Sequence, residues 1–499
     1  DGSITPIGNP TEVALLMWLR GRDIEYKTLR NKYKTLSQEP FSTETKYMET
    51  TVQMADGRVF RLIKGAPEIV LSMCDEIAGS KSAEHVAHTL EQSQNRAMRT
   101  LGFAYQEVVG GKSNPLLFVG VVGIADPVRD DVIEAIDTCR NRAGVRVIIV
   151  TGDTPGTANE IGRQIGLLAA DEAPQSVTGP QFAAMSDQEA MALVADKNFK
   201  IISRARPDDK ARLVMLLQRA GHVVAVTGDG TNDAPALSKA QVGLSMGDGT
   251  SRAKEASDIT IIDNSFSSIN MAIMWGRSLY RNIRRFIIFQ MTINLCACLI
   301  VLLGAFLGLE SPLTVTQMLW VNLIMDTFAA MALASLPPSM TVMKDAPRKR
   351  EDFIIDKAMW ANILSVGLIF TVLILGLAYV TNTYDIKSLA DLLNLSALAP
   401  QSGVSPYERS LMFTLFVMFQ FWNMFNARAY LTGASALHFK GCNSFVSIAA
   451  VIVLGQVAIV TLGGTMFNVD PLSLNDWLIC ILGTSIVLWI GEIFRLFKK

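Results

Sequence analysis

Three short segments of this 499-residue chain carry side chains that could bind a phosphoryl group. Phosphoryl transfer needs a metal-binding carboxylate, hydrogen-bond donors for the transferred oxygens and a positive charge. Glycines beside such groups let backbone amides approach the ligand closely. The candidate residues are Asp229, Asn232 and Asp233 in "TGDGTNDAPAL" (227–237), Thr151, Gly152 and Asp153 in "VTGD" (150–153), and Lys210 in "RARPDDK" (204–210). A single glycine-rich turn is weak support, but two such turns with a lysine between them predict a phosphate site.

The elements that would position these residues alternate between strand and helix. Apolar, β-rich runs that lead into an aspartate occur within 116–126, 145–153, 199–210 and 222–237, with helical stretches between them. This alternation predicts a parallel, doubly wound sheet, which binds ligands at the carboxyl ends of its strands. Asp126, Asp153 and Asp229 fall at three of those ends.

The second half of the chain contains long apolar stretches of the kind that cross membranes. Six apolar stretches are long enough to cross a hydrocarbon core of about 30 Å. They lie at 285–308, 314–335, 360–380, 410–427, 445–467 and 476–496. Lys and Arg gather before the first stretch, after the second, between the fourth and fifth, and at the end of the chain. By the positive-inside rule we expect those segments, and both termini, to face the cytoplasm.

Polar residues inside the apolar stretches need a partner, because a lipid-exposed polar group is costly. Those considered as cation ligands are Asn294, Asn322, Asp326 and Gln420, and Asn423 and Asn426 lie in the same stretch as Gln420. Asn322 precedes Asp326 by four residues, so an α-helix would place both on one face. A carboxylate with amide oxygens suits a hard cation such as Ca²⁺. The alternative interpretation is hydrogen bonding between helices.

The ordered motifs resemble those of a known family. The motifs "KGAPE" (64–68), "DPVRDDV" (126–132), "VTGD", "RARPDDK" and "TGDGTNDAPAL" look like the signature of P-type cation ATPases. The apolar segments "FQMTIN" (289–294) and "WVNLIMDTFAAMALA" (320–334) look most like the plasma-membrane calcium-pump subgroup. The resemblance runs through essentially the whole chain.

The resemblance implies a multidomain α/β protein joined to an all-α membrane part. We expect a partial nucleotide-binding domain at 1–122, a partial phosphorylation domain at 123–270, and a stalk with six transmembrane helices at 271–499. The phosphorylation domain of this family is haloacid-dehalogenase-like, with a Rossmann-like sheet. The implied activity is ATP-driven calcium export through an aspartyl phosphate, across the plasma or inner membrane of the cell.

The resemblance also assigns residues. Asp229 resembles the aspartate that binds Mg²⁺, with Asn232 and Asp233 organising the phosphate region. Thr151, Gly152 and Asp153 resemble the segment that contacts phosphoryl group and nucleotide, and Lys210 resembles the phosphate-stabilising lysine. The positions that match ATP-binding residues of the family are Glu12, Phe41, Lys46, Lys64, Gly65 and Arg99. The implied partners are ATP, Mg²⁺, transported Ca²⁺ and the lipid bilayer, for a pump that is monomeric when complete.

One departure from the family is large. The phosphorylated aspartate of the family stands in "DKTG", and that string does not occur here. We therefore expect the chain to be a carboxyl-terminal portion of a pump, inactive alone and without a calmodulin-binding tail. The net charge of −1 does not favour nucleic acid as a partner. The alternatives are a pump for Na⁺, H⁺ or Mn²⁺, a membrane-tethered phosphatase of the haloacid-dehalogenase group, and a non-catalytic nucleotide-binding membrane protein.

Overall fold

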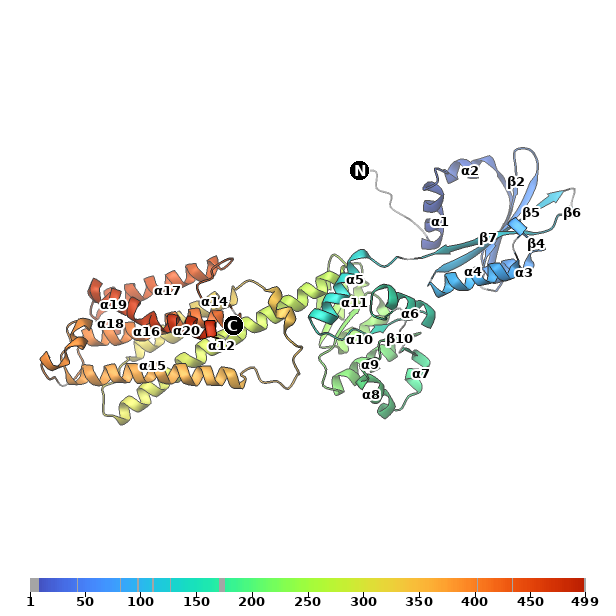
Figure 1. Cartoon of the computed structure of the whole chain (residues 1–499). Coiled ribbons are helices and arrows are strands. Elements are labelled where there is room, and N and C mark those ends of the chain that lie inside the picture. The colour runs from blue at the N-terminus through green and yellow to red at the C-terminus, as the bar shows by residue number, and fades with distance from the viewer. Residues whose placement is uncertain are drawn as a thin grey trace. The chain divides into compact units, whose positions relative to one another are not determined.

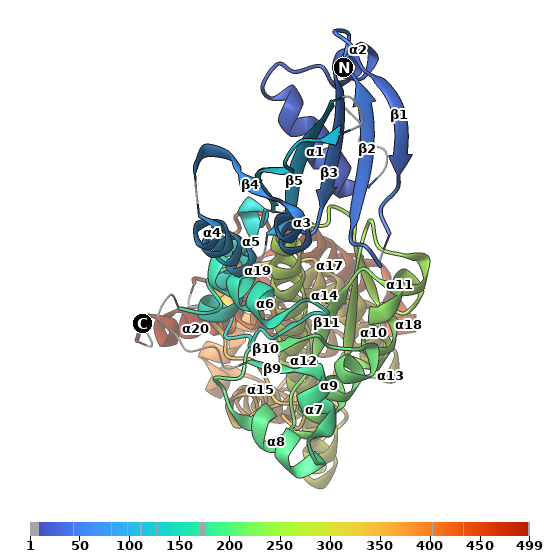
Figure 2. The same ribbon diagram turned by 90° about the vertical axis from the view of Figure 1, so that its right-hand side faces the viewer.

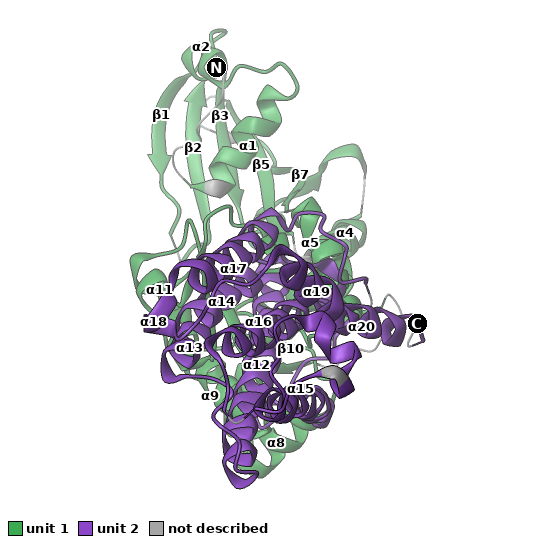
Figure 3. Ribbon diagram, turned by 90° about the vertical axis from the view of Figure 1, so that its left-hand side faces the viewer, with its two compact units in different colours: residues 1–269 green, residues 270–499 purple. Residues whose placement is uncertain are grey.

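The computed structural model describes residues 9–42, 44–80, 82–96, 98–109, 112–125, 127–169, 176–401, 403–432 and 434–497. The chain divides into two compact units, residues 1–269 and 270–499, which Figure 3 colours separately. Every named strand of the described residues belongs to the first unit, and the second unit is helical (Figure 1). An α/β part followed by a helical membrane part was predicted, and the structure confirms it.

The first part of the first unit contains a seven-stranded sheet (Figure 2). Its order is β1-β2-β3-β5-β7-β4, with the short β6 paired to β5, and only β4 and β7 run parallel. The strands are β1 (Lys34–Glu39), β2 (Tyr47–Gln53), β3 (Val59–Gly65), β4 (Glu76–Ile77), β5 (Arg99–Val109), β6 (Lys112–Ser113) and β7 (Leu117–Ile124). The helices are α1 (Pro10–Arg20), α2 (Tyr26–Lys32), α3 (Pro67–Met73) and α4 (Ala83–Asn95). A core of Ile63, Val70, Val86, Ala104, Leu116 and Phe118 joins the sheet to α3 and α4.

The apolar run 116–126 was predicted to join the parallel sheet, and that prediction is wrong. Its strand, β7, pairs antiparallel with β5 and parallel with β4. A short apolar run indicates a buried strand, but its residues do not say which neighbour it takes. Asp126, the predicted strand-end carboxylate, lies outside the described residues.

The remaining six strands are all parallel, as the alternating pattern predicted, but they form two sheets of three strands instead of one. The first has the order β8-β10-β9 and the second β11-β12-β13. The strands are β8 (Ile149–Val150), β9 (Ser176–Thr178), β10 (Ile201–Ser203), β11 (Ala225–Gly228), β12 (Val242–Met246) and β13 (Ile259–Ile261). Phe182, Phe199, Ile202 and Leu216 pack in their common core.

Helices follow these strands and set the positions of the loops. They are α5 (Asp130–Asp137), α6 (Pro155–Gln164), α7 (Gly179–Ala184), α8 (Asp187–Ala195), α9 (Pro207–Arg219), α10 (Ala234–Lys239) and α11 (Ser251–Glu255). Proline occupies the first turn of α6 and of α9, where its fixed φ favours helix and its missing N–H costs nothing. Helix α6 starts shortly after the predicted phosphate-site segment 150–153, and α9 starts within the segment 204–210.

The second unit is a bundle of long helices. It contains α12 (Phe266–Phe306), α13 (Val315–Leu319), a π-helical turn η4 (Trp320–Met325), α14 (Asp326–Ala334), α15 (Lys357–Thr383), α16 (Pro406–Ala429), α17 (Asn443–Leu462), α18 (Gly464–Phe467), α19 (Leu474–Thr484) and α20 (Ile486–Phe497). Short turns η5 (Met340–Lys344), η6 (Leu389–Leu393) and η7 (Leu395–Ala397) lie in the connections. At 1.5 Å per residue, the 41 residues of α12 exceed the length needed to span a membrane. The stalk expected at the start of 271–499 and the first predicted span, 285–308, form this one continuous helix.

Five of the six predicted spans are long and apolar enough to cross a membrane. They are Phe266–Phe306, Val315–Ala334, Lys357–Thr383, Asn443–Leu462 and Leu474–Phe497. The stretch 410–427 forms α16, a 24-residue helix that is not among these five candidates. Most of α16 is buried inside the bundle. A helix enclosed by other helices can carry amides such as Gln420 and Asn423 that a lipid-facing helix cannot, and these lower its hydropathy.

Candidate phosphate, nucleotide and cation sites

Lys210 and Asp233 form the centre of the predicted phosphate site. Lys210 Nζ lies 2.6 Å from Asp233 Oδ1, and both side chains are largely buried. The other carboxylate oxygen, Oδ2, accepts hydrogen bonds from the backbone N–H groups of Asp229 (3.2 Å) and Gly230 (3.1 Å). A Cβ on Gly228 would lie 2.4 Å from the Cβ of Asp233, so only glycine fits there. Asp233 thus fixes the turn and holds the lysine.

Asp229 is placed differently from Asp233. Its backbone carbonyl accepts a hydrogen bond from Thr250 N (2.8 Å), while the residue itself is exposed. Lys210 pairs with Asp233 and leaves the Asp229 carboxylate open to a ligand. A carboxylate with free oxygens in a turn of fixed backbone is the donor type that Mg²⁺ prefers. Asp229 therefore fits a magnesium ligand, and Asn232 lies exposed beside it in the turn η3 (Thr231–Asp233).

The segment Thr151–Asp153 forms a turn of its own at the end of β8. Thr151 Oγ1 donates to Asp153 Oδ2 (2.8 Å) and accepts from Asp153 N (3.1 Å). The backbone of this turn accepts hydrogen bonds from Arg204 N and Ala205 N, both at 2.8 Å. The same Arg204–Ala205 segment leads into α9, which carries Lys210. The structure therefore ties the first predicted segment to the one that supplies the lysine.

The predicted nucleotide residues lie at one end of the seven-stranded sheet. Lys64 Nζ contacts Glu12 Oε1 of α1 at 2.5 Å. Arg99 Nη1 donates to Thr11 Oγ1 at 2.8 Å, so two predicted cations meet the same turn of α1. These contacts bring together residues that are more than fifty positions apart in the sequence.

Gly65 and Lys46 meet at the same end of the sheet. A Cβ on Gly65 would lie 2.4 Å from the Cβ of Tyr47 and 2.6 Å from the carbonyl oxygen of Lys46, so the close approach of β2 and β3 requires glycine. Ala66 N donates to that carbonyl oxygen at 2.9 Å, and the Lys46 side chain is exposed. The motif that contains Lys64 thus also fixes the backbone around Lys46.

A groove of about 750 Å³ lies over the face of the sheet that carries Lys64. Met48, Phe60, Leu62, Phe103 and Tyr105 contribute apolar surface to it. Its volume is in the range of small-molecule and cofactor sites. Phe41 does not line this groove, but its ring is 59% exposed in the loop after β1. The ring is therefore free to stack on a ligand.

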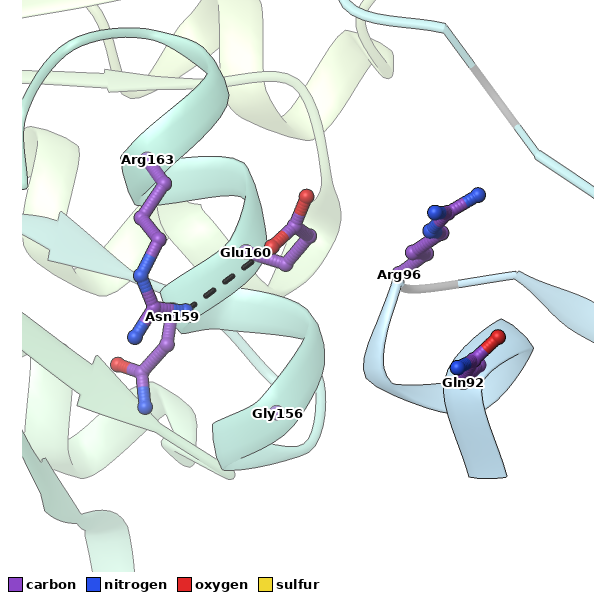
Figure 4. A pocket seen from close by; sticks show the side chains of 6 residues that line it. All are labelled: Gln92, Arg96, Gly156, Asn159, Glu160 and Arg163. Atoms are coloured by element: carbon purple, nitrogen blue, oxygen red, sulfur yellow. Dashed lines mark ion pairs between the residues drawn. The ribbon is translucent and has the colours of Figure 1, made fainter. Parts of the chain in front are cut away.

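A second cavity, of about 470 Å³, contains none of the predicted residues (Figure 4). Gln92 and Arg96 line it from the end of α4, and Gly156, Asn159, Glu160 and Arg163 line it from α6. Arg163 and Glu160 form an ion pair at 3.9 Å. No sequence motif marks this cavity, because its residues are ordinary surface residues near two helices that are distant in sequence.

In the second unit (residues 270–499), called the membrane unit from here on, Asp326 is 4% exposed and begins α14 directly after the π-helical turn. Its backbone N–H donates to the carbonyl of Val321, five residues earlier. Its Oδ2 accepts a hydrogen bond from Gln290 Nε2 at 2.6 Å. Gln290 was not predicted as a site residue, although it is a polar residue in an apolar helix and precedes Asn294 by one turn.

The other predicted cation residues differ in burial. Asn322 lies within the π-helical turn and is exposed, so it does not share the buried environment of Asp326 that an α-helical spacing predicted. Asn294 is half-buried on α12. Gln420 is fully buried, and among the described residues neither polar atom of its amide has a hydrogen-bond partner. The structure thus pairs Asp326 with Gln290 instead of Asn322.

Three family profiles match consecutive parts of the chain. "P-type ATPase, cytoplasmic domain N" matches residues 1–131, "haloacid dehalogenase-like hydrolase" matches residues 211–273, and "Cation transporting ATPase, C-terminus" matches residues 310–497. Their order agrees with the sheet that carries Lys64, the turn that carries Asp229 and the helical unit that carries Asp326.

Individual relatives resemble nearly the whole chain. Calcium-transporting ATPase 4, plasma membrane-type, of Arabidopsis thaliana is 36% identical over 515 residues, which is 99% of this chain and 48% of the relative. Calcium-transporting ATPase PAT1 of Dictyostelium discoideum is 35% identical, over 99% of this chain and 47% of the relative. Calcium-transporting ATPase 7, plasma membrane-type, of Oryza sativa subsp. japonica is 37% identical, over 97% and 47%. The chain therefore spans about half the length of the curated relatives it matches, and nearly all of it resembles P-type cation-transporting ATPases.

Proposed function

We propose that this chain provides the nucleotide-binding, phosphate-binding and cation-binding groups of an ATP-driven calcium pump that works through an aspartyl phosphate. The observation that carries the proposal is the Lys210–Asp233 pair. Asp233 holds the ammonium group of Lys210 and the backbone N–H groups of the turn that carries the exposed Asp229 carboxylate. That arrangement supplies a metal-binding carboxylate and a positive charge, two of the groups that phosphoryl transfer requires. The relatives named as calcium-transporting ATPases support calcium as the cargo.

Each phosphate-site residue has a separate role in this proposal. Asp229 would hold Mg²⁺, which supplies positive charge to the phosphoryl oxygens when bound. Lys210 stabilises the phosphoryl group, and Asp233 keeps that lysine and the turn in place. The Thr151 hydroxyl donates to Asp153 in this structure, and it would turn to donate to the phosphoryl group or nucleotide when either is bound. The phosphorylated aspartate itself does not stand in a "DKTG" string within these 499 residues.

ATP would lie at the end of the seven-stranded sheet. Lys64 meets its phosphates and exchanges its contact with Glu12 for them, and Phe41 stacks on its adenine. Lys46, Gly65 and Arg99 complete this site. The domain boundaries 1–122, 123–270 and 271–499 separate the nucleotide, phosphate and membrane parts.

The cation would cross through the helical unit. Asp326 is the carboxylate ligand, and Asn294, Asn322 and Gln420 are the amide ligands. The protein is a multi-pass membrane protein, and we place it in the plasma or inner membrane with both ends of this chain in the cytoplasm. A site with one carboxylate does not by itself exclude Na⁺, H⁺ or Mn²⁺, so the test must vary the ion.

The test uses membranes that contain the product of the native gene. They are incubated with radioactive ATP, with and without micromolar calcium, and the proteins are separated in acid. We expect a labelled band that needs calcium and that hydroxylamine removes. A band of equal intensity with and without calcium would support the phosphoenzyme and reject calcium as the transported ion. No labelled band would reject the phosphoenzyme.

A further inference from the structure

Gln290 contacts the buried carboxylate of the membrane unit, and although it stands in "FQMTIN" (289–294), no role has been assigned to it above. Its Nε2 donates to Asp326 Oδ2 at 2.6 Å, across two helices that are 36 positions apart in sequence at this contact. We propose that Gln290 is a ligand and affinity-determining residue of the cation site. Its amide N–H donates to the Asp326 carboxylate, and its carbonyl oxygen binds the cation. This inference rests on the proposed cation transport.

Two buried oxygens without hydrogen-bond partners among the described residues indicate what kind of ligand this site would bind. Gln290 Oε1 and Asp326 Oδ1 are both buried, and neither has a hydrogen-bond partner in the described structure. Buried polar atoms in folded proteins nearly always have a partner. Both orphaned atoms are oxygens, so the missing ligand must offer positive charge or hydrogen-bond donors. A cation that binds an amide oxygen and a carboxylate oxygen satisfies both.

The backbone supports the same location. Asp326 stands where the π-helical turn η4 meets α14, and its N–H bonds to the carbonyl of Val321. Single π-helical turns inside α-helices occur often at functional sites. On α12, Asn294 follows Gln290 by four residues and therefore lies on the same face one turn further on. Gln290 thus links the helix that carries Asn294 to the helix that carries Asp326.

A purely structural hydrogen bond is the competing explanation. Amides between membrane helices can serve as such links. That role would use the N–H donor, which Gln290 does use, but it would leave two neighbouring buried oxygens unsatisfied. A structural link also predicts that any change at Gln290 affects folding and not calcium affinity in particular.

The test is equilibrium binding of radioactive calcium to the 499-residue chain in lipid nanodiscs. Gln290→Leu keeps the size of the side chain and removes its oxygen. We expect it to weaken calcium binding at least about tenfold, the lower end of the loss seen when groups that support a metal site are removed. Gln290→Glu restores an oxygen and is expected to bind calcium again, with an affinity that falls as the pH is lowered because protons then compete for the added carboxylate.

The matched control is Gln456→Leu. Gln456 is also a fully buried amide in the membrane unit, and its Oε1 accepts a hydrogen bond from Trp320 Nε1 at 3.0 Å. We expect this variant to bind calcium as the unchanged chain does. Equal weakening in both leucine variants, or unchanged affinity in Gln290→Leu, would overturn the role of Gln290. If Gln290→Leu does not fold, failure of Gln290→Glu to bind calcium or to show the pH dependence would overturn it.

The two proposals fail in different ways. If the unchanged chain binds no calcium, the cation site and the role of Gln290 are both rejected. If the unchanged chain binds calcium and the Gln290 variants behave like it, only the role of Gln290 is rejected. The labelling experiment on the native gene product is independent of either result.

Discussion

The ammonium group of Lys210 lies 2.6 Å from one oxygen of Asp233, whose other oxygen accepts two backbone N–H groups of the turn at Asp229. One carboxylate therefore determines the position of a cation and the shape of a loop at once. Because its oxygens are occupied in this way, Asp233 organises the site, and the exposed Asp229 is left for ligand binding.

Lys210→Ala should reduce the calcium-dependent labelling of the native gene product by ATP at least about a hundredfold, the effect of removing one group that stabilises transition-state charge. It should also destabilise the protein by about 1–3 kcal/mol, because the Asp233 carboxylate loses a partner while remaining mostly buried. Acid-gel labelling measures the first effect and thermal unfolding measures the second. Lys239→Ala, at an exposed lysine of α10, is the control and should label normally. Normal labelling of Lys210→Ala would remove this lysine from the site.

Gly228→Ala should disturb the same site by sterics alone. The added methyl group would lie 2.4 Å from the Cβ of Asp233, so the turn must shift. We expect a loss of about 1–3 kcal/mol of stability, as for other overpacked positions, together with reduced labelling. Gly156→Ala is the matched control, because a Cβ there meets no atom within 4 Å. Thermal unfolding of both variants should separate them, and equal stability would show that the turn relaxes freely.

Asp187 gives the first unit a stability that depends on pH. A hydrogen bond from Arg212 holds the pKa of this carboxyl below its usual value of 3.8. A lowered pKa in the folded state means that the contribution is present above the unfolded pKa and disappears as the pH falls through the folded pKa. The melting temperature of the unchanged chain should therefore exceed that of Asp187→Asn at pH 7. The difference should shrink below about pH 3.8 and vanish in stronger acid. A difference that stays constant down to pH 2 would contradict this origin.

The strand ends were predictable because they combine two independent signals, an apolar β-rich run and a glycine–aspartate turn. Thr151–Asp153 and Asp229–Asp233 lie where that combination placed them, just after β8 and β11. The partner of a strand is harder to predict, because it depends on contacts far away in sequence. For that reason β7 joined the antiparallel sheet although its composition resembles that of the parallel strands.

The membrane site was only partly predictable. Asp326 was identified because a carboxylate in an apolar run needs a partner. The partner itself was missed, because the spacing rule for a regular α-helix favoured Asn322. The chain instead forms a π-helical turn at that point, and Gln290 of another helix makes the contact. The amide-rich helix α16 shows the same limit, because its burial by neighbours cannot be read from its own residues.

Lys64→Ala should weaken ATP binding to the 499-residue chain by about tenfold, since it removes one charge-assisted contact to phosphate. The contact of Lys64 with Glu12 at 2.5 Å gives a second variant with a different outcome. Glu12→Gln keeps a similar shape and removes the competing negative charge, so ATP should bind to this variant as well as or better than to the unchanged chain.

Isothermal titration with ATP measures both affinities, and Lys32→Ala, which changes an exposed lysine at the end of α2, is the control. Equal weakening by Lys64→Ala and Glu12→Gln would mean that the ion pair itself supports the fold, whereas unchanged affinity in Lys64→Ala would place the phosphates elsewhere. The opposite responses that we expect follow only if Lys64 exchanges a carboxylate for a phosphate when ATP binds.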